Sequence, residues 1–210
     1  MSTTKPFLKY TNIASLLDTL LNKRLFLLDP NLWEDKNDSY YINVYKEMEN
    51  LKTVLAICFA ETYETFHHWK VFSDNISGVC IEFYKDKLLS HFQNNGNVIM
   101  GRVDYKKIKE LEEDLKSNFT NNSKLPFYKR YPYRDEEEYR ILYKNAHEEL
   151  QSKPFHIGLD CIKQILLSYH LPDVLYESIK QIIQKIDGCL NLRVIKTSLI
   201  DNKKWKSIIS

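Results

Sequence analysis

Glycine is scarce in this chain, which has 5 glycines among its 210 residues. Phosphate-binding loops depend on glycine, because only a residue without a side chain lets the backbone approach a phosphate in the required conformation. The sequence contains neither a P-loop nor a G-x-G-x-x-G dinucleotide fingerprint. We therefore expect no nucleotide site of these two classes.

Cysteine is also sparse, and no cysteine pair has the spacing of zinc ligands. The six histidines do not complete such a site, so the sequence predicts no metal centre. The cysteines lie in apolar runs, which is typical of buried free thiols in a reducing cytosol. These cysteines are Cys58, Cys80, Cys161 and Cys189.

An excess of charge and a long apolar run are both missing. Lys and Arg number 30 against 28 Asp and Glu, for a net charge of +2. This balance argues against nucleic-acid binding over the whole surface and leaves a local basic patch open. No apolar run is long enough to span a bilayer, and the first residues lack the apolar core of a secretory signal. We expect a cytoplasmic protein without a membrane partner; its oligomeric state is not predicted.

Short apolar runs and amphipathic segments are present in irregular order. The chain is long enough for one full hydrophobic core, and it shows no βα repeat and no internal duplication. This pattern predicts a single α+β domain over residues 1–210, with a mixed or antiparallel central sheet and flanking helices. The segment 162–167 is apolar enough for strand or helix, and we predict a strand. Strands are predicted at 7–10, 25–28, 54–59, 79–83, 98–105, 138–143, 162–167 and 192–199, and helices at 13–23, 40–51, 66–72, 106–119 and from 172 onward.

The most suggestive polar group is Glu136, Glu138 and Arg140. Alternate residues of a strand share a face, so on a strand these three side chains point into one cleft. Two neighbouring carboxylates repel each other, which raises one pKa and suits acid–base chemistry. The alternative is a solvated acidic turn in which Arg140 forms an ordinary ion pair.

Two further groups combine aromatic rings with polar side chains. Lys9 can meet a phosphate while Tyr10 stacks on a base or nicotinamide ring, or Tyr10 is simply part of the core. The run His67-His68-Trp69 offers an imidazole for acid–base work. More often, one histidine of such a pair is packed and the other is exposed.

A basic and aromatic stretch can grip phosphates while its rings stack on bases, or it can be a solvated loop whose tyrosines pack inward. Glu82 lies within an apolar strand, where it is either exposed on the outer face or a paired internal charge. The members of the stretch are Tyr128, Lys129, Arg130, Tyr131, Tyr133 and Arg134.

In their order along nearly the whole chain, several motifs resemble an uncharacterised bacterial family, domain of unknown function 2971. The 29–36 loop keeps Pro30 and Asp35 but lacks an asparagine and a second proline of the family pattern, and Tyr133 replaces a tryptophan. The resemblance raises the functional interest of Glu136, Glu138 and Arg140. The matching motifs are Lys9-Tyr10, the loop Asp29–Lys36, Cys58-Phe59, Trp69–Phe72 with Gly78–Phe83, Val103 with Tyr105, and Lys129, Tyr133, Glu136, Glu138 and Arg140.

A more distant likeness is to ADP-ribosyltransferase folds, including DNA-modifying toxins. The opening Lys9-Tyr10-Thr11-Asn12, followed by a helix and the strand 25–28, is similar, and Glu136-x-Glu138 resembles the Glu-x-Glu arrangement of some of these enzymes. The strand 162–167 departs from the pattern, because its polar positions are Lys163 and Gln164 rather than a glutamate.

This likeness implies an NAD-using transferase or hydrolase with a nucleic-acid or protein acceptor, in a toxin or anti-phage defence setting. Lys9 and Tyr10 would hold the dinucleotide, with Tyr10 also a catalytic candidate, and Trp69 would wall the nicotinamide pocket. Glu138 would bind the ribose and stabilise its developing positive charge, while Glu136 would orient or deprotonate the acceptor. Arg140 would anchor the strand or a phosphate.

Two alternatives of other classes stay open. One is a non-catalytic nucleic-acid or nucleotide-binding module that uses Lys129, Arg130 and Arg134. The other is a nuclease in which Glu82, Glu136 and Glu138 hold a divalent metal.

Overall fold

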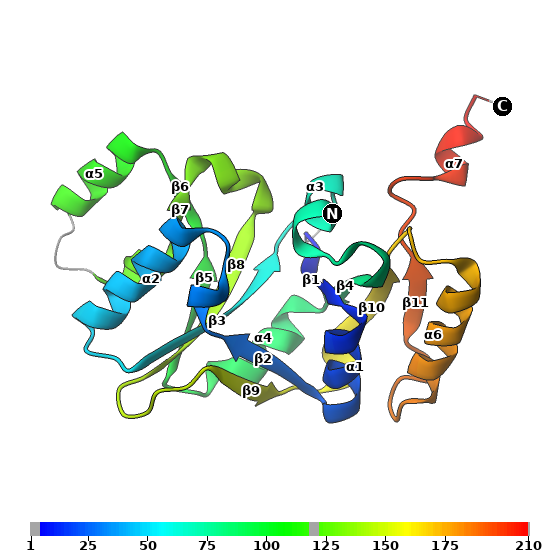
Figure 1. The fold of residues 1–210 in the computed structure, drawn as a ribbon, viewed down its shortest axis with the longest axis horizontal. Helices are drawn as coiled ribbons and strands as arrows, with labels where there is room; N and C mark the ends of the chain where they lie inside the picture. The colour runs from blue at the N-terminus through cyan, green and yellow to red at the C-terminus, as the bar shows by residue number, and fades with distance from the viewer. Residues whose placement is uncertain (1–4, 118–121, 210) are drawn as a thin grey trace. The chain divides into compact units, whose positions relative to one another are not determined.

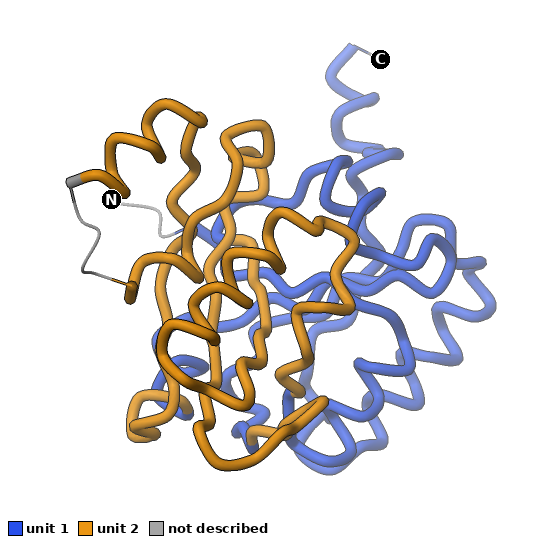
Figure 2. The backbone as a smooth tube through the Cα atoms, turned by 60° about the vertical axis from the view of Figure 1, so that its left-hand side comes forward, with its two compact units in different colours: residues 1–25, 61–91, 156–210 blue, residues 26–60, 92–155 orange. Residues whose placement is uncertain are grey.

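The computed structural model describes residues 5–117 and 122–209, in which helices and strands follow one another irregularly, as in an α+β protein (Figure 1). Two units form along the chain: unit 1 comprises residues 1–25, 61–91 and 156–210, and unit 2 comprises residues 26–60 and 92–155 (Figure 2). Three elements cross a unit boundary in sequence: β2 (Arg24–Leu28), α4 (Lys85–Gln93) and β9 (Ser152–His156). The prediction of one domain over residues 1–210 stays a prediction.

Unit 1 contains a mixed sheet with the strand order β1-β4-β10-β11. The antiparallel pairs are β1 with β4 and β4 with β10, whereas β10 and β11 run parallel. The predicted mixed sheet and the predicted strand at 162–167 are therefore confirmed. The four strands are β1 (Phe7–Asn12), β4 (Gly78–Phe83), β10 (Ile162–Leu167) and β11 (Arg193–Lys196).

Side-chain caps set the start of three helices in unit 1, and Asn202 is the cap of α7. The Asn12 side chain accepts a hydrogen bond from the Ser15 amide at 2.9 Å and caps the start of α1. Thr65 caps α3 in the same way. Helix α6 lies alongside β11 in Figure 1, where the Tyr176 hydroxyl donates to the Val194 carbonyl at 3.1 Å. The helical elements are α1 (Ile13–Asn22), α3 (Phe66–Phe72), α6 (Asp173–Lys185), α7 (Lys203–Lys206) and the 3-10 turns η2 (Asn75–Ser77) and η5 (Leu159–Cys161).

Unit 2 is built on the long antiparallel pairing of β3 with β8. The two strands pair antiparallel from Thr53–Asn145 to Ala60–Glu138, β5 pairs with the other edge of β8, and Leu28 of β2 pairs with Ala56. Nearly every residue of β3 is buried, which confirms its prediction as a central strand. The strands are β3 (Thr53–Ala60), β5 (Val98–Arg102), β8 (Glu138–Asn145) and the short parallel pair β6 (Asp104–Lys106) and β7 (Tyr128–Arg130).

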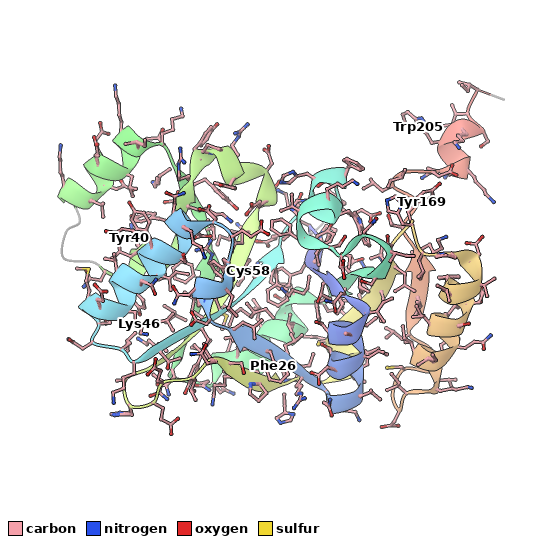
Figure 3. All side chains as sticks on the ribbon, in the orientation of Figure 1. Phe26, Tyr40, Lys46, Cys58, Tyr169 and Trp205 are labelled. Atoms are coloured by element: carbon pink, nitrogen blue, oxygen red, sulfur yellow. The ribbon has the colours of Figure 1, made fainter. Side chains whose placement is uncertain are left out.

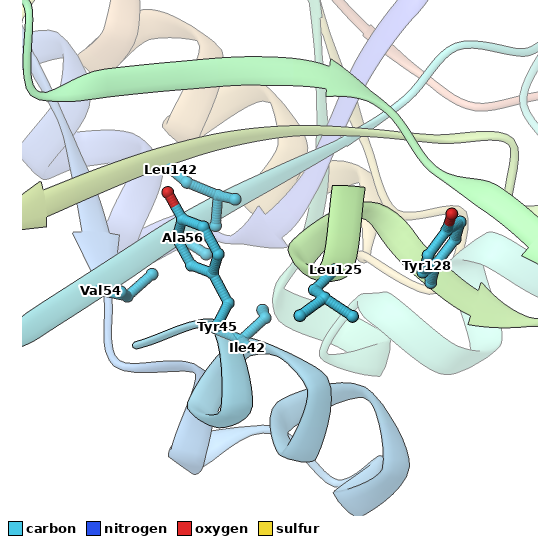
Figure 4. Close-up of a cluster of buried hydrophobic side chains, with 7 residues drawn as sticks. All are labelled: Ile42, Tyr45, Val54, Ala56, Leu125, Tyr128 and Leu142. Atoms are coloured by element: carbon cyan, nitrogen blue, oxygen red, sulfur yellow. The ribbon is translucent and has the colours of Figure 1, made fainter. Parts of the chain in front are cut away.

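Helix α2 covers this sheet through an apolar cluster (Figure 4). The helix begins earlier than predicted, because the Asp35 side chain accepts the Asn37 amide at 2.9 Å and caps it. The cluster consists of Ile42, Tyr45, Val54, Ala56, Leu125, Tyr128 and Leu142. The remaining helical elements are α2 (Lys36–Met48), α5 (Ile108–Ser117), η1 (Pro30–Leu32), η3 (Asn122–Phe127) and η4 (Tyr131–Glu136). No helix in the described ranges combines the length and apolar character needed to span a bilayer.

Candidate functional site

Unit 2 brings five charged side chains together below its surface, and we call them the ionic cluster: Asp38, Lys129, Glu136, Glu138 and Arg140. Asp38 comes from the first turn of α2, Lys129 from β7 and Glu136 from the end of η4. Glu138 and Arg140 both come from the start of β8. Four elements therefore supply one set of charges: three that follow one another along the chain, and α2 from about ninety residues earlier.

Arg140 is the centre of the cluster and is fully buried. Its Nε donates to Glu138 Oε1 at 2.6 Å, and its Nη2 donates to Asp38 Oδ2 at 2.5 Å and to Glu138 Oε2 at 3.1 Å. Its Nη1 donates to the Pro126 carbonyl at 2.9 Å, and the Trp33 ring lies 5.2 Å from the guanidinium carbon. The guanidinium is thus held from several directions, as expected for a buried arginine that pairs with carboxylates.

Lys129 is the second cation of the cluster. Its Nζ lies 2.5 Å from Glu136 Oε2, 3.0 Å from Glu138 Oε2 and 3.4 Å from Asp38 Oδ2. Only 8% of the side chain is exposed, and its ionic contacts are with the three carboxylates of the cluster. The sequence left open whether Lys129 grips a phosphate or lies in a solvated loop, and its burial excludes the solvated loop for this residue.

The carboxylates of the cluster differ in their pKa. Burial disfavours the charged form of Glu138, but Arg140 and then Lys129 outweigh it and hold its pKa below the ordinary value. Burial raises the pKa of Asp38 and of Glu136, against the opposing effect of Arg140 on Asp38 and of Lys129 on Glu136. Three carboxylates face two cations, so the fully ionised cluster has a net charge of −1. One proton added to Asp38 or Glu136 makes it neutral.

The predicted grouping of Glu136, Glu138 and Arg140 holds, but the reason given for it does not. Glu136 ends a 3-10 turn, and Glu137 has a left-handed backbone with φ of 42°, so β8 begins only at Glu138. Lys129, rather than strand alternation, brings Glu136 to Glu138. The alternative of a solvated acidic turn is wrong, because both glutamates and Arg140 are buried.

Sequence reasoning missed Asp38, and it named Tyr105 only as part of a family motif, without its contact to the cluster. Asp38 shares one face of α2 with the core residues Ile42 and Tyr45, and a carboxylate on an otherwise apolar face is a signal that the sequence carried. Tyr105 accepts the Glu138 amide at its hydroxyl at 2.8 Å, and burial, reinforced by Glu138, raises its pKa. No sequence signal marks that contact.

Unit 1 contains a pocket of about 230 Å³ at the carboxyl ends of the parallel strands β10 and β11. Ser168 directly follows β10 and Thr197 directly follows β11. Figure 3 labels Tyr169 near the tip of β11. Ligands commonly bind beyond the carboxyl ends of parallel strands. The lining residues are Phe66, Trp69, Lys70, Ser73, Asn75, Ser168, Tyr169, His170, Thr197, Leu199 and Ile200.

Hydrogen bonds to Glu64 fix two walls of this pocket. Glu64 Oε2 accepts from the indole nitrogen of Trp69 at 2.9 Å and from the hydroxyl of Thr197 at 2.8 Å. Together, these two hydrogen bonds connect α3 to the segment after β11 through Glu64. Glu64 had not been singled out from the sequence, because its partner Thr197 lies far along the chain.

Tyr10 and Trp69 pack against each other in unit 1. Their rings meet edge to face with centroids 5.6 Å apart, and Tyr10 stacks on His68 at 5.3 Å. The Tyr10 hydroxyl is buried beside Cys80 and the Thr65 backbone without a hydrogen bond of normal geometry, and burial raises its pKa. Lys9 precedes Tyr10 in β1 and so leaves the strand on the opposite face.

The structure decides two alternatives that the sequence left open, which concern the burial of the His67-His68 pair and of Glu82. His68 is packed while His67 is exposed, and Thr65 Oγ1 lies 2.5 Å from His68 Nδ1. Glu82 is a paired internal charge, because Lys163 Nζ donates to it at 2.7 Å and Gln164 also donates to it. Across residues 5–117 and 122–209, no group of three or more His, Cys, Asp or Glu is arranged to hold a metal ion.

Comparison with known proteins finds a similarity to a family over part of the chain. Residues 68–141 match the family model "Protein of unknown function (DUF2971)". The matched segment contains Trp69, the strand β4 and the cluster residues from Lys129 to Arg140, so the resemblance expected from the motifs is confirmed there. The search among curated proteins finds no match.

A search among solved structures finds "Thermus sp. 2.9 DarT in complex with carba-NAD+". The alignment covers 94% of this chain and 97% of that one, with 13% sequence identity and a TM-score of 0.45. At such a score it carries no argument about activity.

Proposed function

We propose that this chain is an NAD-using enzyme of ADP-ribosyltransferase type, in a toxin or anti-phage defence setting. The observation that carries the proposal is that Trp69, expected from the sequence to wall a nicotinamide pocket, lines the pocket of unit 1. Pockets for drug-sized ligands span roughly 300–1,000 Å³. The smaller volume here, about 230 Å³, suits one substituted aromatic ring rather than a whole dinucleotide.

The lining of the pocket has the chemistry that a nicotinamide ring requires. Phe66, Trp69 and Tyr169 offer aromatic faces for stacking. The buried residues Ser168 and Thr197 offer hydroxyls that can exchange hydrogen bonds with a carboxamide. Lys70, which is exposed, offers a cation to a phosphate.

The reaction also needs a carboxylate, since loss of nicotinamide leaves positive charge on the ribose. Glu138 is our candidate, because Arg140 and Lys129 keep it ionised at neutral pH. Glu136 is the candidate for accepting a proton from the acceptor, since burial raises its pKa toward the working range. Arg140 positions Glu138, and Tyr10 supports Trp69 edge-on.

The test is NAD turnover and transfer of label from NAD to a bacterial lysate, with wild type beside Glu138→Gln. The matched control is Asp38→Asn, which removes one buried negative charge from the same ionic cluster. We expect Glu138→Gln to abolish turnover and Asp38→Asn to retain most of it, with both variants shown to be folded by circular dichroism. Equal activity of Glu138→Gln and wild type, or no turnover and no NAD binding at millimolar concentration by wild type, would refute the proposal.

A second candidate function is nucleic-acid binding without catalysis. Tyr131 favours it, because its partly exposed ring lies 5.0 Å from Lys107 Nζ and 4.6 Å from the guanidinium carbon of Arg134. A ring flanked by cations suits a stacked base with phosphates beside it. This function predicts strongly salt-dependent binding that survives Glu138→Gln and weakens in Arg134→Ala.

A further inference from the structure

We infer that Glu64 makes the pocket of unit 1 selective for an aromatic carboxamide over the corresponding aromatic carboxylate. Glu64 acts as a positioning residue, through the hydroxyl of Thr197 and the indole of Trp69. The inference rests on the proposed function, because that function names the pyridine carboxamide ring as the ligand of this pocket.

The direction of the Thr197 hydrogen bond is the first step. A hydroxyl has one proton to donate and two lone pairs to accept with. The Thr197 hydroxyl donates its proton to Glu64 Oε2 at 2.8 Å, and one lone pair accepts the Leu199 amide at 3.2 Å. What Thr197 can offer to a ligand is therefore its remaining lone pair.

The ligand must then be a donor at this point. The NH₂ group of a carboxamide donates to a lone pair, whereas a carboxylate has nothing to donate. A carboxylate ligand would also add negative charge beside the Glu64 carboxylate, which is unfavourable in a partly buried site. Both effects favour binding of the carboxamide over the carboxylate.

Trp69 supplies the second wall. Its single N–H donates to the same Glu64 oxygen at 2.9 Å, which fixes the orientation of the indole in the pocket. Tyr10 packs against the indole edge to face from within the unit. One glutamate thus holds an aromatic wall and a polarised hydroxyl together.

The experiment measures binding of nicotinamide and of nicotinate at neutral pH by NMR. The reporter is the indole N–H signal of Trp69, assigned with Trp69→Phe. The variants are Glu64→Gln, Glu64→Ala and Thr197→Val, and the control is Glu177→Ala, an exposed glutamate of α6 that is not a lining residue of the pocket. Turnover of NAD is measured on the same proteins.

We expect wild type and Glu177→Ala to prefer nicotinamide by about tenfold or more, the ratio that one hydrogen bond to a correctly placed partner supplies. Glu64→Gln should lower this preference, because its amide group can donate to Thr197 and turn the hydroxyl proton toward the ligand. Thr197→Val should weaken nicotinamide binding and leave nicotinate binding nearly unchanged. Glu64→Ala should also shift the Trp69 indole signal; if it does not fold, Glu64→Gln and Thr197→Val decide.

Wild-type protein that binds nicotinate as well as nicotinamide, or binds neither, overturns the inference. Preserved preference in Glu64→Gln overturns it as well, even if NAD turnover is intact. Selective nicotinamide binding that depends on Glu64, in a protein that does not turn over NAD, supports the inference and contradicts the proposed enzyme. The two failures are therefore distinguishable.

Discussion

Replacement of Arg140 by methionine is the sharpest test of the ionic cluster. The guanidinium makes two hydrogen bonds to Glu138, one to Asp38 and one to the Pro126 carbonyl, all without solvent. Methionine keeps much of the length of the arginine stem, so the main change is the loss of charge and donors. Removal of one partner from a buried ion pair costs about 3–5 kcal/mol, because the remaining charge stays buried without compensation.

The assay is urea unfolding at neutral pH, read as the change in midpoint at constant m-value. We expect Arg140→Met to lose about 3–5 kcal/mol of unfolding free energy. Arg140→Lys should lose less, since it keeps the charge but not the planar fork that spans Glu138 and Asp38. The double variant Arg140→Met/Glu138→Gln should be more stable than the sum of the single variants predicts, by at least about 1 kcal/mol.

Two results would contradict this reasoning. A loss below about 1 kcal/mol in Arg140→Met would place the cluster in the range of solvent-exposed ion pairs rather than buried ones. Additive effects in the double variant would mean that Arg140 and Glu138 do not interact energetically, whatever their distance.

The remaining predictions concern pH, thiols and Tyr10. Arg140 and Lys129 outweigh burial and lower the pKa of Glu138 in the folded protein. The ionised Glu138 therefore stabilises the fold above the ordinary pKa of 4.5, and this stabilisation is lost as the pH falls below that value. Acid unfolding followed by circular dichroism checks this prediction. Burial raises the pKa of Asp38 in the folded protein above the ordinary value of 3.8. Wild type should therefore lose stability relative to Asp38→Asn as the pH rises above 3.8. A difference in unfolding free energy between the two proteins that does not change with pH would contradict this prediction. Burial raises the pKa of Cys161 to about 12, whereas Cys58 is only half-buried, so iodoacetamide at neutral pH should label Cys58 first, as read by peptide mass spectrometry. Tyr10→Phe should leave the unfolding free energy within about 1 kcal/mol of wild type, because the buried hydroxyl makes no normal hydrogen bond, so any loss of NAD turnover in that variant would reflect function.

Local patterns were sufficient for most of the elements. The apolar run 54–59 predicted β3, and the helical segment 13–23 predicted α1, because strand burial and helix periodicity depend on neighbours along the chain. Helix α4 was not predicted, although Leu88, Leu89 and Phe92 follow helical spacing and are buried. The predicted strand 98–105 is divided into β5 and β6, with Val103 between them.

The candidate site residues also divide into those that local patterns predict and those that they do not. Glu138 and Arg140 could be chosen from the sequence, since alternation along one strand brings them to the same face. Glu136 was placed on that strand wrongly, because a left-handed residue at Glu137 ends a 3-10 turn before the strand starts. Asp38, the other carboxylate that pairs with Arg140 and Lys129, comes from a helix about a hundred residues earlier than Arg140, and local sequence cannot show such a contact.

What the sequence by itself determined is therefore the α+β class, most strands, and the identity of Trp69, Glu138 and Arg140 as residues of interest. Only the tertiary structure decided what surrounds them. The parallel pairing of β10 with β11 places Ser168 beside Thr197, and Glu64 then ties Thr197 to Trp69. The physical reason is that burial and charge pairing arise between segments far apart along the chain, whereas periodicity and capping record only near neighbours.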